Sequence, residues 1–148
     1  MALKQSSWAK GLLQAPTSRE GGGVVAEKYK FTVAENLAAG DIIELGILPA
    51  FHQVVEAILI VDEAGTATYD VGIMSGAVGA ATNSDGSPRT SGNELFAGAA
   101  DASVTRATKP DGFRIAPVEA DRSIGVKLVG AGITAANQVI ELVLLTKQ

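Results

Sequence analysis

The stretch of residues 53–76 most constrains the fold, because it contains two apolar segments of strand character with turn residues between them. Residues 54–61 are almost wholly aliphatic, with a single acidic residue. A run of this kind, bounded by turn signals, is typical of a strand buried within a sheet. Residues 68–74 alternate, with an apolar side chain at every second position from Tyr69 to Ile73. The two segments predict a hairpin, and its apolar side needs a second sheet to cover it.

Strand signals recur along the rest of the chain and bring the expected number of strands to about eight. The alternation or apolar character of six further segments predicts strands at residues 28–33, 41–48, 102–109, 113–116, 123–129 and 138–145. Gly46 indicates a bulge within the second of these segments. Residues 75–93 are rich in glycine, alanine and small polar residues, which predicts a long loop. Residues 93–100 predict one short helix, with Asn93 as its N-cap.

Many short strands, frequent turns and 17 scattered glycines favour an all-β fold. The first prediction is a jelly-roll β-sandwich of about eight strands, formed by residues 24–148. A β-barrel and an immunoglobulin-like sandwich are the alternatives. With only 5% aromatic residues, the core must consist mainly of aliphatic side chains.

The first 23 residues differ from the rest and predict an extended N-terminal arm with a glycine-rich hinge at residues 21–23. One interpretation is a frayed terminus, and the other is an arm that becomes ordered on a partner. Trp8 is the only tryptophan in the chain, and tryptophan is enriched among the anchors of interfaces. The candidate residues for contact with a partner are therefore Trp8, Leu12, Leu13 and Arg19.

Charge and composition argue against several functional classes. The net charge of −4 argues against direct binding of nucleic acid, which needs clustered lysine and arginine. The absence of cysteine excludes a disulfide framework and a thiolate metal site. The sequence has neither an apolar run of membrane-spanning length nor an apolar N-terminal leader. We therefore expect a protein made in the cytoplasm that does not contact a membrane.

No motif in the sequence predicts catalysis, a metal site or a cofactor. His52 is the only histidine, and no second histidine exists to share a metal with it. Residues 130–135 match the spelling of a dinucleotide-binding loop, but too few residues follow for the helix and strand that such a fold needs. Residues 83–86 lack the flanking carboxylates of a calcium loop and predict a polar turn, with positive φ at the Asp85-Gly86 pair. We expect a protein that is not an enzyme.

Several short motifs, taken in order, resemble the small structural proteins encoded beside the major capsid gene of tailed bacteriophages. The motifs are D-V-G-x-x-S-G at residues 70–76, the glycine-rich loop with Arg89 that follows it, G-F-R-I-A at residues 112–116, and D-R-S-I-G-V at residues 121–126. The resemblance covers about residues 27–145.

The resemblance implies a jelly-roll cement protein, also called a head decoration protein, that binds the outside of an assembled capsid. The implied partner is the major capsid protein. Separately, the aliphatic, weakly charged faces of the predicted strands favour self-association, as a homodimer or, alternatively, a homotrimer. The implied location is the exterior of the virion capsid. The competing hypothesis is a carbohydrate-binding or fibre-like phage module, since jelly rolls host many functions.

Overall fold

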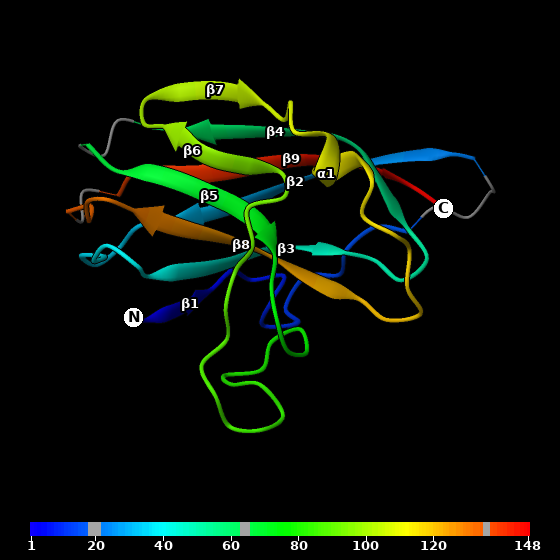
Figure 1. Cartoon of the computed structure of the whole chain (residues 1–148), viewed down its shortest axis with the longest axis horizontal. Helices are drawn as coiled ribbons and strands as arrows, with labels where there is room; N and C mark the ends of the chain where they lie inside the picture. Colours follow the sequence, from blue (N-terminus) through cyan, green and yellow to red (C-terminus); the bar gives the residue numbers. More distant parts are fainter. Residues whose placement is uncertain (18–21, 63–65, 135–136) are drawn as a thin grey trace.

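The computed structural model describes residues 1–17, 22–62, 66–134 and 137–148. The described residues form nine strands and one short helix, arranged as two packed sheets (Figure 1). The elements in chain order are β1 (Leu3–Gln5), β2 (Val24–Thr32), β3 (Ile42–Leu48), β4 (Gln53–Val61), β5 (Thr68–Ile73), β6 (Phe96–Ala100), β7 (Ser103–Arg106), α1 (Pro110–Phe113), β8 (Arg122–Val129) and β9 (Val139–Lys147).

The strand order confirms the predicted jelly roll. One sheet has the order β1-β3-β8-β5-β6 and the other has the order β2-β9-β4-β7. The eight strands from β2 to β9 pair antiparallel from the outside inwards: β2 with β9, β3 with β8, β4 with β7 and β5 with β6. Such pairing describes one long hairpin that is rolled up, and the rolling adds the lateral pairs β4·β9 and β5·β8. The ninth strand, β1, adds parallel to β3 at the edge of the first sheet.

The core lies between the two sheets and consists mainly of aliphatic side chains, as the composition predicts. Alternate residues of β4 and β9 point inwards, and β3 is buried along its whole length. Two tyrosines supplement the aliphatic residues. Tyr29 on β2 reaches across the core and donates a hydrogen bond to the carbonyl of Ile47 on β3, at 2.9 Å. Burying these alternating faces from both sides is what stabilises the sandwich.

The predicted bulge at Gly46 is confirmed, and it explains how Tyr29 fits. The register of β3 on β8 shifts between Glu44 and Gly46. A β-carbon at Gly46 would lie 2.8 Å from Cδ2 of Tyr29, closer than real contacts allow. The Tyr29 ring therefore lies close to the bare backbone of the bulge, and glycine is needed there.

The predicted hairpin of residues 54–61 and 68–74 is wrong, although both strands exist. β4 pairs with β7 and β9, whereas β5 pairs with β6 and β8 in the other sheet. The connection therefore crosses from one sheet to the other, and its residues 63–65 lie outside the described residues. The physical reason is that each strand has an apolar face, and the two faces cover each other better across the core than side by side in one sheet.

The predicted helix at residues 93–100 is also wrong, because residues 96–100 form β6. Gly98 has φ of +66°, which no helix permits, and its amide donates to the Asp70 carboxylate at 2.8 Å. The predicted strand at residues 113–116 is wrong as well. Pro110 begins the single turn of α1 there, and the buried Gly112 packs against Leu95. Pairing and packing with distant residues override local propensity at both places.

The long loop between β5 and β6 is confirmed and extends away from the two sheets (Figure 1). It is ordered by two isolated bridges, Met74 with Ser91 and Thr82 with Pro88. At its polar turn the Asp85 carboxylate accepts from the amide and the hydroxyl of Ser87, which lowers the pKa of Asp85, and Gly86 has the predicted positive φ. No helix long and apolar enough to cross a membrane occurs in the part of the chain that the structure describes.

Candidate contact surface

The N-terminal segment does not hang free over residues 2–13, which corrects the expectation of an arm that is frayed or ordered only on a partner. The amide of Ala2 donates to the Asp41 carboxylate at 2.6 Å, and β1 then pairs with β3. The Ser6 amide donates to the carbonyl of Glu44, and the Ser6 hydroxyl donates to the carbonyl of Leu45 at 2.7 Å. The free backbone edge of β3 explains this docking, because it offers hydrogen bonds that would otherwise go to water.

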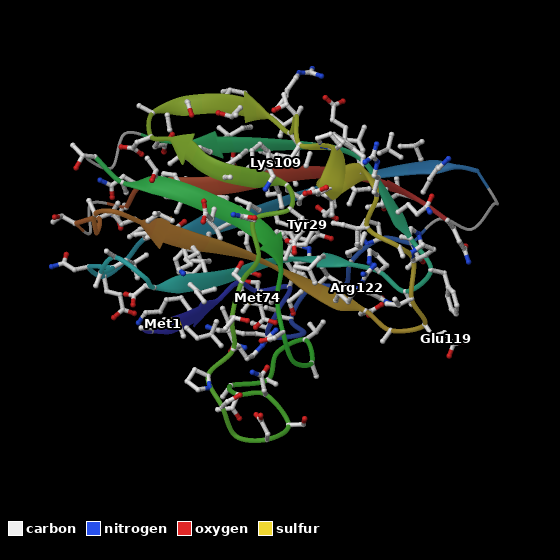
Figure 2. All side chains as sticks on the ribbon, in the orientation of Figure 1. Met1, Tyr29, Met74, Lys109, Glu119 and Arg122 are labelled. Atoms are coloured by element: carbon white, nitrogen blue, oxygen red, sulfur yellow. The ribbon has the colours of Figure 1, made fainter. Side chains whose placement is uncertain are left out.

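After Ser6 the segment folds into a compact turn. The amide of Lys10 donates to the carbonyl of Ser6 at 3.0 Å, and the amide of Leu12 donates to the carbonyl of Ser7 at 2.9 Å. The turn places Trp8 against the core, where its ring meets Tyr29 edge to face with 5.2 Å between the ring centroids. Figure 2 shows Tyr29 near the centre of the molecule. Trp8 is therefore partly engaged within the chain, rather than wholly available to a partner.

In contrast to Trp8, the two candidate leucines are exposed to solvent. Leu12 is 73% exposed and Leu13 is 47% exposed, although the turn that carries them is ordered. Exposed aliphatic side chains on an ordered turn are a suitable contact surface, because burying them costs little conformational entropy. The fourth candidate, Arg19, lies outside the described residues.

Two grooves flank the N-terminal turn. The larger, of about 640 Å³, lies between the turn, the end of β3 and the long loop, with Leu13, Ile47 and Val78 among its lining residues. The second, of about 450 Å³, lies between the turn and β2, and its lining includes Trp8, Leu12, Leu13 and Phe31. The structure thus brings three of the four predicted contact residues together around one groove.

A buried ion pair holds the long loop against the N-terminal segment and the sheet. Nη1 of Arg89 lies 2.8 Å from Oε1 of Glu44, and both side chains are fully buried. The Glu44 carboxylate also accepts from the Gly79 amide at 2.9 Å, from the Gln5 side chain at 2.8 Å and from the Ser123 hydroxyl. Glu44 therefore connects β1, β8 and the loop, and a buried carboxylate needs all of these donors to offset its desolvation.

The guanidinium of Arg89 is equally well satisfied. It donates to the carbonyls of Ser75 and Ala80 and to the Ser123 hydroxyl, at 2.6, 2.9 and 2.9 Å. From the sequence, Arg89 was predicted only as part of a family resemblance, and Glu44 was not predicted at all. The signal available was the single acidic residue within the otherwise apolar run of residues 42–48.

A second exposed apolar feature lies at the turn between β3 and β4, which sequence analysis also missed. Phe51 is 50% exposed and has φ of +63°, an uncommon conformation for a bulky residue. The turn is held by the Phe51 amide, which donates to the carbonyl of Val118 at 2.8 Å, and by the Ala50 amide, which donates to the Asp121 carboxylate at 2.8 Å. Val118 is itself partly exposed, so this end of the sandwich carries a small apolar patch.

The only histidine and the two tyrosines are held within the fold. His52 is buried, and its Nδ1 lies 2.8 Å from the carbonyl oxygen of Ala50. Burial is the main cause that raises the pKa of Tyr29 and of Tyr69 far above the usual value, and the Asp101 carboxylate adds to the effect at Tyr69. Among the described residues, no group of three or more histidine, aspartate or glutamate side chains could hold a metal ion.

Comparison with known proteins gave matches only among solved structures. A scan against models of protein families found no match, and a search of curated proteins found none. A chain of the structure titled "Capsid of Ralstonia phage GP4" is 44% identical, with a TM-score of 0.91, and the match covers 99% of this chain and 98% of that one.

Two more distant chains share the fold alone. One, from "Cyanophage Pam1 capsid asymmetric unit", has 17% identity and a TM-score of 0.63, with 91% of each chain covered. The other, from the acid-stable capsid of Helicobacter pylori bacteriophage KHP30, has 16% identity and a TM-score of 0.54, with 87% of this chain and 90% of that chain covered.

Proposed function

This chain belongs to the family of phage capsid proteins represented by the Ralstonia phage GP4 chain, and from that premise we propose that it is a cement protein that binds the outer surface of an assembled capsid. It is a structural component of the virion. The observation that carries the finer proposal is the ordered N-terminal turn, which presents Leu12 and Leu13 to solvent beside two grooves. Such a surface suits contact with the major capsid subunits and has no evident use in an isolated chain.

The energetics of a cement role are modest for each copy. Burying the exposed parts of Leu12 and Leu13 against a capsid subunit would contribute roughly 1–2 kcal/mol for each residue. A protein present in many identical copies can bind weakly at each site and still stabilise the shell, because binding to the assembled state shifts the equilibrium towards it. No catalytic group is needed for this function, in keeping with a non-enzymatic role.

We also propose that the protein binds the shell as a homo-oligomer, as a dimer rather than a trimer. Two-fold dimers are the commonest closed assemblies, and oligomeric binding would multiply a weak contact at each site. Mass measurement of the purified protein under native conditions tests this. A strictly monomeric protein at the concentration that saturates capsids would contradict it.

The experiment for the main proposal is a binding assay with undecorated, expanded capsids. The wild-type protein should bind saturably, and the double variant Leu12→Ser/Leu13→Ser should bind roughly 10–1000-fold more weakly, from the burial energies above. Val104→Ser is the matched control, because Val104 is 70% exposed on β7, which lies at the opposite edge of the four-stranded sheet from β2. Absence of wild-type binding would refute the proposal.

Point substitutions test the proposal better than removal of residues 1–23. That truncation would also remove β1 and the hydrogen bonds of Ser6 to β3, so it would destabilise the sandwich. The division of the chain at residue 23 remains a prediction.

The alternative, a carbohydrate-binding or fibre-like module, finds little support in the two tyrosines and the tryptophan. Tyr29 and Tyr69 are buried in the core, and Trp8 packs against Tyr29. Sugar sites commonly use an aromatic face that is open to the ligand. A glycan array on which the protein binds several related sugars would favour this alternative over the cement role.

A further inference from the structure

The groove between the N-terminal turn and β2, hereafter the β2 groove, has a chemical character that differs from the protein as a whole. Its apolar lining includes Trp8, Leu12, Leu13 and Phe31. Lys10 and Lys30 also line it, and none of its described lining residues is acidic. The protein has a net charge of −4, so this basic, apolar groove stands out from an acidic background.

The two lysines have no ion-pair partner among the described residues. Lys30 lies directly opposite one described acidic residue, Glu141 on the neighbouring strand β9. The Glu141 carboxylate is engaged by Nζ of Lys28 at 2.8 Å. Lys10 and Lys30 therefore present positive charge to whatever enters the groove.

The groove is lined by one end of a long strand, residues 30–32 of β2. β2 spans nine residues and is the outer strand of its sheet, with β9 on one side and no described strand on the other. The backbone amides and carbonyls on that outer side are a template for an added strand. Natural proteins usually keep such edges short or cover them, so a nine-residue edge with no described strand beyond it is a candidate site for strand addition.

We propose that the β2 groove binds an extended, acidic segment of a capsid subunit, which adds as a strand to the outer edge of β2. Carboxylates of the segment would lie near Lys10 and Lys30, and an apolar side chain would enter between Leu12, Leu13 and Phe31. This inference rests on the proposed function and specifies the chemistry of the partner at the same surface.

The charges on β2 argue against a second copy of this chain as the occupant. Two copies paired through β2 would bring the exposed Lys28 and Lys30 of each copy near those of the other. Like charges on neighbouring strands destabilise pairing, whereas an acidic strand would gain from the same lysines.

Trp8 provides the readout, because it is the only tryptophan and lines the groove. The probe is a short blocked peptide of alternating glutamate and valine, added to the full-length protein. It should change the Trp8 fluorescence saturably, and the same peptide with lysine in place of glutamate should not. Raising the salt from about 0.05 M to about 0.5 M should weaken binding of the acidic peptide.

Charge reversal tests the site itself. The double variant Lys10→Glu/Lys30→Glu should bind the acidic peptide at least about tenfold more weakly. The matched control is Lys127→Glu/Lys147→Glu, which changes the net charge equally on β8 and β9, with Lys147 at the far end of β2 from Lys30. Its affinity should stay within about twofold of wild type. Slower hydrogen exchange of β2 amides in the complex would report the added strand.

The outcomes separate this inference from the proposed function. If wild type shows no response to the acidic peptide, or if both double variants bind it equally well, the inference is wrong. If capsids bind wild type and Lys10→Glu/Lys30→Glu alike, the inference is wrong and the cement role stands. If the acidic peptide binds as described but capsids do not bind at all, the cement role fails while the groove keeps its ligand class.

Discussion

Removing the charge of Glu44 tests whether the buried ion pair holds the long loop and the N-terminal segment to the sandwich. The substitution Glu44→Gln keeps the size of the side chain but leaves the Arg89 guanidinium, 2.8 Å away and fully buried, without its opposite charge. Breaking a buried pair on one side costs about 3–5 kcal/mol, because the remaining charge stays desolvated. For a domain of this size that loss lowers Tm by roughly 6–20 °C.

The assay is urea unfolding followed by circular dichroism, with a double-mutant cycle. Glu44→Gln and Arg89→Gln should each lower the free energy of unfolding by the amount above. The double variant should be about 1–3 kcal/mol more stable than the sum of the single effects predicts, because removing both charges leaves neither one uncompensated. Hydrogen exchange of the Gly79 amide, which donates to Glu44, should accelerate in Glu44→Gln more than that of core amides.

The chain offers a matched control at its surface. Glu56 forms an ion pair with Arg106, whose side chain is exposed, while that of Glu56 is partly exposed. Glu56→Gln should therefore cost less than about 1 kcal/mol. If Glu44→Gln costs no more than Glu56→Gln, or if the two single effects are additive, the buried pair does not hold these segments together and the reasoning fails.

Two further predictions concern backbone strain and pH. Ala102 has φ of +49°, a strained conformation that glycine adopts without cost, so Ala102→Gly should raise the free energy of unfolding by about 0.5–1 kcal/mol. The control Ala100→Gly, within β6, should lower the free energy of unfolding by a similar amount. Equal effects of the two substitutions in urea unfolding would contradict this prediction. Burial raises the pKa of Tyr29 and Tyr69 in the folded state, so as the pH rises the unfolded chain loses these protons first. The free energy of unfolding should therefore fall above about pH 10, by about 1.4 kcal/mol per pH unit for each tyrosine. Tyr69→Phe should remove one tyrosine's share of that slope, and an unchanged slope would show that Tyr69 does not titrate differently in the two states.

Much of the strand content could be read from local pattern. The alternation at residues 28–33 and 123–129, and the apolar run at residues 54–61, correspond to β2, β8 and β4. Alternation is a property of neighbouring residues, because a strand turns successive side chains to opposite faces whatever it pairs with. The bulge at Gly46 could be predicted for the same reason, because a glycine within a strand is a local signal.

The secondary structure predicted from the sequence was wrong where local propensity and packing with distant residues favour different structures. The alanine-rich residues 96–100 have helix propensity, yet they pair with β5 and form a strand. The N-terminal turn that presents Leu12 and Leu13 depends on hydrogen bonds from Ser6 to residues almost forty positions away. The sequence near Ser6 does not indicate those hydrogen-bond partners, so the candidate contact residues could be predicted but the grooves around them could not.

Local sequence patterns predicted a small, mainly aliphatic all-β fold with apolar candidate contact residues near its N-terminus, because those properties depend on composition and on a side-chain period of two. The three-dimensional fold was needed to show which strands face each other, which carboxylate is buried with Arg89, and that Lys10 and Lys30 line one groove. The reason is physical: burial, pairing and local charge are properties of residues that lie side by side in space, and folding brings those residues together from distant parts of the chain.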